Sequence, residues 1–412
     1  MKFKLQFSVN KWLKCGLIFV LTICLAGCSQ SKELCTLTLT MSLAEHEWKV
    51  FRERIFPPFE KEHNVKIHAY QIESGQLATK LEALEAAGKQ KIDLFAQDNM
   101  SLALLINKGL VLDLSEYESR IPQQTLPNLV TSCKFNARLM FMPFRPNVQI
   151  VYYNSEAFEK YNLQIPATWE ELLDVARKFK EQEGEGRVLL KAFGGNPTAT
   201  QIYEFVLQAG GDPYHFDDAG CIAAFKFLQE LWPYVSEESR RAKWDTTNEI
   251  LGQQQAYLAQ NWPFGIAILI QEYQLPFIKT YSGWAGPQGE YHVIGGDCFG
   301  IPKNSRQKTL ALEFIRYVQS KDVQEILLSE LGWPSIREDV VAQVETWQKP
   351  YFEAVQEALR HGVFRKNATW WPAYAKYISE AFREIVIEKA PVEETLKIYK
   401  EKLRKEKSLY DE

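Results

Sequence analysis

The pattern of apolar and polar residues predicts strands and helices in alternation along this chain. Residues 35–41 alternate polar and apolar side chains, which is typical of a half-buried strand. Over 48–59 apolar residues recur at helical spacing, with an interruption at Pro57-Pro58. An extended run over 65–70, a helix over 76–87 that ends at Gly88 and a buried strand over 92–95 follow. This β-α-β-α-β order favours an α/β fold with mostly parallel sheets.

A second group of helices is expected further along. Thr168 and Glu171 form a capping box, in which the Thr168 hydroxyl accepts the Glu171 amide and the Glu171 carboxylate reaches back. Leu172, Val175 and Phe179 continue one apolar face of the helix that begins there. Amphipathic helices are also expected over 311–318 and 378–385, and no internal repeat occurs.

The first 27 residues have the pattern of a bacterial lipoprotein signal. Four lysines precede an uncharged apolar run over 15–26, which is about half the ~20 residues that span a bilayer. The run ends in Leu25-Ala26-Gly27-Cys28. We expect residues 1–27 to be a signal peptide, Cys28 to carry lipid and 28–34 to be a tether on the outer side of the cytoplasmic membrane, facing a periplasm or the cell exterior. An ordinary secretory signal with an incidental cysteine is the alternative.

Length and charge limit the possible partners. A chain of 412 residues suggests two domains or lobes. It has 48 Lys and Arg against 52 Asp and Glu, and removal of Lys2, Lys4, Lys11 and Lys14 with the signal makes it more acidic still. This balance gives no reason to expect nucleic acid or an anionic membrane surface as a partner.

The remaining cysteines predict no metal or redox centre. Cys35, Cys133, Cys221 and Cys298 are scattered without C-x-x-C spacing. An exported protein can form disulfides, but the spacing assigns none.

Motifs for catalysis are also lacking. His46-Glu47 has no second histidine four positions on, because Val50 stands there, and no nucleophile elbow, Walker loop or dinucleotide-binding glycine pattern occurs. We therefore expect neither cofactor nor metal. Paired carboxylates far apart in sequence would still permit a glycosidase.

Tryptophans beside proline and glycine are the strongest chemical feature. They occur in Asn261-Trp262-Pro263, Ser282-Gly283-Trp284 and Trp370-Trp371-Pro372. Flat aromatic faces suit the C–H faces of sugar rings, while nearby Asp, Asn, Glu and Arg can bind the hydroxyls. The composition thus favours carbohydrate binding.

Several motifs share order and spacing with one family. Met142-Pro143, then Val151-Tyr152-Tyr153-Asn154, then Pro166-Ala167-Thr168-Trp169-Glu170-Glu171-Leu172 is similar to its signature "YN…P-x-TW-x-EL". Over nearly the whole mature chain, the sequence resembles the extracellular solute-binding proteins of family 1, the maltose-binding-protein-like receptors of ABC sugar importers.

The resemblance implies a non-enzymatic, monomeric receptor that delivers a sugar or oligosaccharide to an ABC permease. It implies a type II periplasmic-binding-protein fold, with one lobe from 35–145 plus 286–340 and the other from 146–285 plus 341–412. Crossovers near 143–152 and 283–296 would form the hinge, with the sugar in the cleft. The same fold could instead serve polyamine, iron or a peptide, and a secreted glycoside-acting enzyme is the other rival.

The ligand contacts that the resemblance implies lie in both lobes. Core packing of Tyr203 and Tyr374, and helix capping by Asp98 and Asn99, are the alternative interpretations. The implied contacts are Glu73, Asp98, Asn99, Asn147, Tyr203, Trp262, Asp297, Arg365, Trp370, Trp371 and Tyr374.

Overall fold

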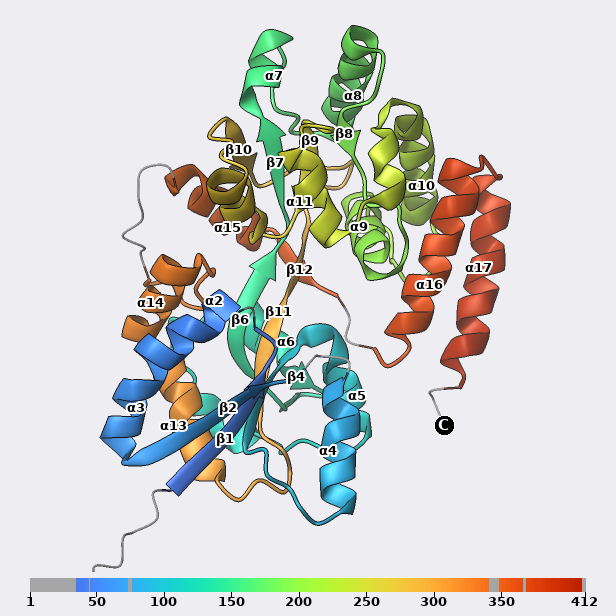
Figure 1. The fold of residues 1–412 in the computed structure, drawn as a ribbon. Coiled ribbons are helices and arrows are strands. Elements are labelled where there is room, and N and C mark those ends of the chain that lie inside the picture. Colours follow the sequence, from blue (N-terminus) through green and yellow to red (C-terminus); the bar gives the residue numbers. More distant parts are fainter. Residues whose placement is uncertain (1–34, 44, 73–75, 341–347, 366–367, 410–412) are drawn as a thin grey trace, which may run out of the picture.

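The computed structural model describes residues 35–43, 45–72, 76–340, 348–365 and 368–409, which form two α/β lobes (Figure 1). A six-stranded sheet in the first lobe has the order β12-β11-β3-β1-β2, with β6 also paired to β11. Its strands are β1 (Cys35–Met41), β2 (Val65–Gln71), β3 (Leu94–Asp98), β6 (Met142–Val148), β11 (His292–Gly300) and β12 (Gly362–Phe364). The two-lobed fold expected from the sequence is confirmed.

The second lobe contains a four-stranded sheet of order β10-β7-β9-β8. Its strands are β7 (Ile150–Asn154), β8 (Val188–Leu189), β9 (Leu258–Asn261) and β10 (Ile278–Tyr281). A separate two-stranded hairpin in the first lobe consists of β4 (Lys134–Phe135) and β5 (Arg138–Leu139).

Helices surround both sheets. In the first lobe α3 and α13 lie to one side of the sheet and α4 and α5 to the other, whereas α16 and α17 form a pair at the outer edge of the second lobe (Figure 1). The first lobe has α2 (Glu45–Val50), α3 (Phe56–His63), α4 (Leu77–Ala86), α5 (Leu102–Asn107), α6 (Pro127–Ser132), α13 (Lys308–Val318) and α14 (Lys321–Leu331). The second has α7 (Ser155–Lys160), α8 (Trp169–Glu183), α9 (Gly195–Gln208), α10 (Ala219–Leu231), α11 (Trp244–Gly252), α12 (Gly265–Ala267), α15 (Lys349–Arg360), α16 (Trp371–Phe382) and α17 (Val392–Lys407).

The expectation of mostly parallel sheets was wrong for β11. β1 is parallel to β2 and β3, but β11 is antiparallel to both β3 and β6. In the second lobe β7 is antiparallel to β9 and β10. The cause is topological, because β11 enters the first sheet from the second lobe rather than from a preceding helix of its own sheet.

Two local predictions are refined. The helical run before Pro57-Pro58 is not broken; it widens into a π-helical segment over Phe51–Ile55, and the prolines occupy the first turn of α3. Proline lacks an amide donor and its ring crowds the preceding turn, which a wider turn relieves. Thr168 accepts the Glu171 amide as expected, but the Glu171 carboxylate accepts the amide of Ala167 rather than that of Thr168.

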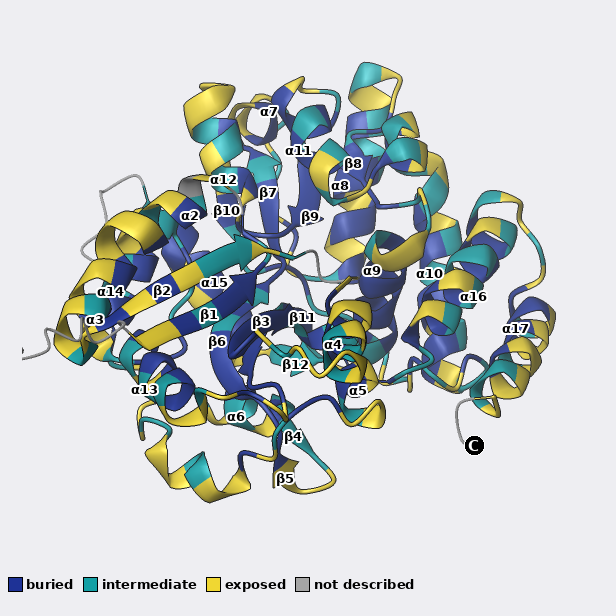
Figure 2. Cartoon of the chain, turned by 60° about the horizontal axis from the view of Figure 1, so that its bottom comes forward, coloured by how far each residue is buried: buried dark blue, intermediate teal, exposed yellow. Residues whose placement is uncertain are grey.

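Each lobe has its own hydrophobic core, and a third cluster lies between them. The first core includes Phe51, Phe59 and Phe95, and the second includes Phe179 and Phe205. The third combines residues of β6, β7 and β11 with residues of α14 and α15. Figure 2 shows buried positions along the strands and exposed positions on the outer helix faces.

The chain passes from one sheet to the other directly between β6 and β7. Gln149 alone separates these strands, and its side chain is fully buried. Its amide has no hydrogen-bond partner among the described residues. The first predicted crossover therefore lies where expected, and β11 returns in the opposite direction beside β6.

Candidate functional site between the lobes

Arg365 connects the two lobes by hydrogen bonds. It follows β12 and is 5% exposed. Its Nη1 donates to Oγ1 of Thr200 on α9 at 2.7 Å, and its Nη2 contacts Oδ1 of Asn99, just after β3, at 3.5 Å. Its Nε has no partner among the described residues. A buried guanidinium with an unused donor at a lobe junction is suited to binding a polar ligand.

The indole of Trp262 packs against β11 at the same junction. Trp262 follows β9 and packs edge-to-face with Trp244, with ring centroids 6.1 Å apart. A Cβ at Gly295 would lie 2.9 Å from Trp262 Cη2 and 3.4 Å from Arg365 Nη2. Gly295 pairs with Asn147 in the β6–β11 ladder. The absence of a side chain at 295 therefore lets Trp262 and Arg365 meet beside Asn147.

Trp371 forms the second aromatic surface at the junction. The Arg365 guanidinium lies 5.3 Å from the centroid of its ring, within the range of a cation–π contact. Its Nε1 donates to Oδ1 of Asn196 on the first turn of α9 at 2.9 Å. The ring is thus held by α9 at one edge and faces Arg365.

The other predicted aromatic residues pack together in the second lobe. Tyr203 and Tyr374 are buried and pack edge-to-face, and the Tyr203 ring is 6.2 Å from Trp371. Trp370 packs on Tyr214, with ring centroids 4.8 Å apart. Tyr203 and Tyr374 therefore support the position of Trp371 from behind.

Two predicted carboxylates belong to an ionic cluster in the first lobe. Asp98 and Asp297 are register partners of β3 and β11, and Asp98 Oδ1 accepts the Met100 amide. Asp297 pairs with Arg145 at 2.5 Å, and Arg145 also pairs with Glu47 at 3.1 Å. Burial and the neighbouring carboxylates raise the pKa of Asp297 to about 6, although Arg145 opposes this rise.

A buried polar network lies behind Trp262. Lys191 Nζ donates to the carbonyl of Gln260 at 2.6 Å, and Gln260 donates to the Glu204 carboxylate. The other Glu204 oxygen accepts the Val293 amide at 2.9 Å. Burial lowers the pKa of Lys191 to about 7, although Glu204 favours its charge. The network ties the end of β9 to the start of β11 through α9.

A cavity opens on the first-lobe side of Arg365. It has a volume of about 310 Å³, within the range of small-molecule sites of roughly 300–1,000 Å³. Asn99 and Arg365 line it together with Phe364 and residues at the end of α6 and in the β4–β5 hairpin. The junction thus has a space beside its polar and aromatic groups.

The predicted ligand contacts fall into three groups. Asn99, Asn147, Trp262, Arg365 and Trp371 meet at the junction, and Asp98 and Asp297 lie in the adjoining ionic cluster. Tyr203, Trp370 and Tyr374 belong to the aromatic packing of the second lobe. Glu73 lies outside the described residues, as does the lipidation candidate Cys28.

Sequence reasoning missed Thr200, Gly295 and Arg145 as members of the site. Arg145 follows the Met142-Pro143 motif, and Gly295 is the first of a glycine pair within a strand, a pattern that marks close approach of another group. No sequence pattern distinguishes Thr200 from other helix residues.

The described part of the chain offers no alternative centre for metal chemistry. Its His, Cys, Asp and Glu residues form no group of three that could hold a metal ion. Within the same residues, every helix is too short or too polar to cross a bilayer.

Comparison with known proteins identifies the class that this fold and site define. A model of bacterial extracellular solute-binding proteins matches residues 55–354. The chain belongs to this family of extracellular, substrate-binding proteins.

Individual relatives are distant. The chain is 23% identical over 186 residues to an uncharacterized ABC transporter extracellular-binding protein of Pyrococcus horikoshii, covering 44% of each chain. It is also 23% identical over 185 residues to the multiple sugar-binding protein of Streptococcus mutans, covering 42% of this chain and 43% of that protein. The alignments thus span less than half of these curated relatives.

The fold match extends over nearly the whole molecule. The structure of a cyclic alpha-maltosyl-1,6-maltose binding protein from Arthrobacter globiformis superposes with a TM-score of 0.78 at 18% identity. The match covers 90% of this chain and 99% of that one. The described elements therefore form a complete solute-binding-protein fold.

Proposed function

We propose that this protein captures a sugar or oligosaccharide between its lobes and delivers it to the transmembrane subunits of an ABC importer. The observation that carries the proposal is the position of Arg365. This residue links Asn99 to Thr200 and lies beside the indoles of Trp262 and Trp371. Flat rings next to charged and amide groups match the apolar faces and hydroxyls of a sugar.

Two of the matched proteins support a carbohydrate as the ligand. The Streptococcus mutans relative is named for binding multiple sugars, and the Arthrobacter globiformis structure is that of a maltosyl-maltose binding protein. We extend that ligand class to this chain because its own junction offers flat rings beside charged and amide groups.

Ligand entry requires movement at the junction. Trp262 is 6% exposed and Trp371 3%, so neither indole has a free face in this conformation. A sugar can reach them only when Arg365 moves or the lobes separate. A ligand that touches both lobes would then stabilise the closed form by its higher affinity for that form.

The lobe boundaries and the anchor complete the proposal. One lobe comprises 35–145 plus 286–340 and the other 146–285 plus 341–412, except that β12 within the last segment joins the sheet of the first lobe. Cys28 carries lipid that holds the protein on the outer side of the membrane, where it acts as a monomer without catalysing a reaction. Dual acyl chains at ~0.8 kcal/mol per buried methylene would suffice for a firm anchor.

A thermal-shift screen of the purified protein tests the ligand class. Neutral mono- and oligosaccharides, polyamines, ferric chelates and short peptides are each added over a concentration series. A sugar at about 100 times its Kd adds ~2.7 kcal/mol to the stability of the native state. Stabilisation by a polyamine, iron or a peptide alone would replace the sugar assignment, and turnover of a glycoside would identify an enzyme.

A further inference from the structure

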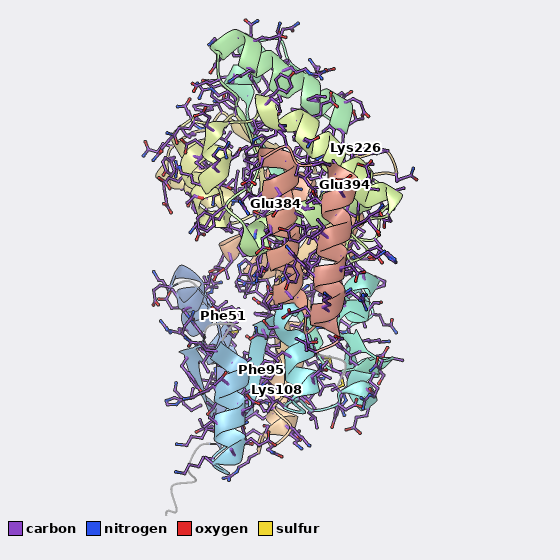
Figure 3. The ribbon with its side chains drawn as sticks, turned by 90° about the vertical axis from the view of Figure 1, so that its right-hand side faces the viewer. Phe51, Phe95, Lys108, Lys226, Glu384 and Glu394 are labelled. Carbon is purple, nitrogen blue, oxygen red and sulfur yellow. The ribbon has the colours of Figure 1, made fainter. Side chains whose placement is uncertain are left out.

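A second, larger cavity lies on the second lobe, apart from the junction. It has a volume of about 520 Å³, and its lining comes from α9, the segment 211–215, Trp370 and the last turns of α17. Figure 3 looks onto α16 and α17. Glu384 and Glu394 are labelled toward the upper ends of these helices. The lower end of α17 lies near the first lobe, where Lys108 is labelled.

Aromatic rings form one wall of this cavity. Tyr214 and Trp370 line it with their planes at 87° and their centroids 4.8 Å apart. Tyr203 lines it as well and contacts Trp371, so the cavity adjoins the lobe junction through one layer of rings. Such rings offer flat apolar surface to the C–H face of a sugar.

Cationic side chains form the opposite wall. Lys400, Arg404 and Lys407 are spaced i, i+4 and i+7 on α17, which brings them to the same face of the helix, and all three line the cavity. Asp212 is the one carboxylate among the lining residues that the structure describes. The lining thus has a surplus of positive charge.

Lys400 and Arg404 are held by ion pairs near the surface. Lys400 pairs with Asp217 at 2.8 Å and Arg404 with Glu401 at 2.9 Å, and all four side chains are partly exposed. Exposed pairs of this kind contribute little and exchange readily with another anion. Lys407 Nζ lies 3.9 Å from the Trp370 ring centroid, so charge and aromatic surface meet at one point.

On these grounds we infer that the cavity is a binding site for a sugar unit that carries a carboxylate, that is, a uronate. Its ring would stack on one of the two perpendicular rings, Trp370 or Tyr214, and meet the other edge-on, and its carboxylate would meet Arg404 and Lys407. A neutral sugar would use only the rings, and a carboxylate without a sugar ring would use only the cations. The inference rests on the proposed function, because it adds a second site for the same class of ligand.

Calorimetry with matched ligands tests the site. One ligand is an oligosaccharide with a terminal uronate, and the other is the same oligosaccharide after reduction of its carboxylate to the alcohol. Because a charge-assisted hydrogen bond contributes more than a neutral one, we expect the wild-type protein to prefer the uronate by about tenfold or more. The ratio of the affinities for the two ligands should decrease when the NaCl concentration is raised from about 0.05 to 0.5 M, because salt screens the charges.

Substitutions locate the effect. The double variant Arg404→Gln, Lys407→Gln should bind both ligands about equally, with little loss of affinity for the reduced one. Lys405→Gln, on the same helix but outside the lining, is the matched control and should keep the preference. Thermal melting of each variant confirms that folding is retained.

Four outcomes overturn the inference. Equal wild-type affinity for the two ligands, or a preference that survives in the double variant, excludes a uronate site here while leaving sugar binding intact. An equally strong, variant-sensitive response to glutarate excludes the sugar ring as a requirement. If neither oligosaccharide binds while a neutral sugar from the thermal-shift screen does, the inference fails and the proposed function stands; if no sugar of that screen binds, the proposed function fails too.

Discussion

The edge of the Trp262 indole occupies the space that a side chain at Gly295 would fill. One residue ends β9 in the second lobe and the other lies on β11 in the first sheet, so this contact is made across the lobe junction. Close packing at this point couples the aromatic surface to the strand that joins the lobes.

Trp262→Ala should weaken both binding and stability. Loss of a central aromatic anchor typically costs at least ~2 kcal/mol of binding, roughly thirtyfold in Kd. Because the ring is buried, its truncation should also lower the free energy of unfolding by ~3–5 kcal/mol. Calorimetry with a sugar found in the screen and urea unfolding measure the two effects.

Trp169→Ala is the matched control, since Trp169 is equally buried but stacks on Phe227 in the second core. It should lose stability while keeping affinity. Unchanged affinity of Trp262→Ala would assign this residue to packing alone.

Arg365→Gln should open the unliganded molecule and weaken ligand binding. The substitution removes the charged link between Asn99 and Thr200, so the separated lobes become more populated. Lost charge-assisted hydrogen bonds cost ~1.5–3 kcal/mol, roughly ten- to a hundredfold in affinity. Small-angle scattering without ligand should show a larger radius of gyration.

Arg187→Gln provides the comparison, because Arg187 pairs with Glu183 within the second lobe. That variant should scatter like the wild type. An unchanged radius for Arg365→Gln would mean that other contacts hold the lobes together.

His292 should make stability depend on pH. Burial opposes its charge, but the carboxylates of Glu290, 2.7 Å from Nε2, and Glu204, 3.6 Å from Nδ1, outweigh burial and raise its pKa to about 9. The folded state then binds a proton more tightly than the unfolded state, with its ordinary pKa of ~6.5. The difference in pKa contributes about 3 kcal/mol to the free energy of unfolding, at 1.36 kcal/mol per pKa unit. This contribution is fully present below pH 6.5 and is lost as the pH rises to 9.

Urea unfolding of wild type and His292→Gln between pH 6 and 9.5 measures this contribution. The stability advantage of the wild type should shrink across that interval, and the comparison cancels the titration of other groups such as Lys191. His215→Gln, at an exposed position, should follow the wild-type profile. If the free energies of unfolding of wild type and His292→Gln differed by the same amount at every pH, the prediction would be contradicted.

Cys28→Ser should abolish lipid attachment. The processing enzyme transfers lipid to the thiol, so the variant should remain unlabelled by radioactive fatty acid and either become soluble or keep its signal. Cys35→Ser removes a thiol seven residues later and should be labelled normally. Label in Cys28→Ser equal to that of the wild type would refute the anchor.

Thiol reactivity should follow burial. Cys35 is exposed, whereas Cys133, Cys221 and Cys298 are buried and unbridged, with the sulfurs of Cys133 and Cys298 3.5 Å apart. A thiol reagent should therefore modify Cys35 rapidly and the other three only on unfolding. Rapid modification of Cys133 in the folded protein would contradict this description.

The sequence predicted the elements whose cause is local. The strand over 35–41 and the helix beginning after Thr168 depend on alternation and capping, and both are confirmed. The direction of β11 could not be predicted, because it depends on a connection between lobes rather than on the residues of the strand.

The site was predicted only in part, for a similar reason. Trp262, Trp371, Asn99 and Arg365 were all candidates, but their meeting point requires a bare backbone at Gly295 and a hydroxyl at Thr200. Trp370 and Trp371 are neighbours in sequence, yet Trp370 lines the second-lobe cavity whereas Trp371 faces Arg365, because the chain turns into α16 between them. The different surroundings of two adjacent residues depend on three-dimensional packing.

The pairing of β6 with β11 limits how the two halves of the molecule can move. These antiparallel strands are hydrogen-bonded from Val148 and Ile294 to Met142 and Phe299, so neither can bend without the other. Two strands joined by hydrogen bonds bend together about an axis that crosses both. Sliding or twisting of one strand against the other would break the hydrogen bonds between them. Bending about this axis is therefore the motion that the paired strands allow, and its extent is a quantity that a transporter could sense.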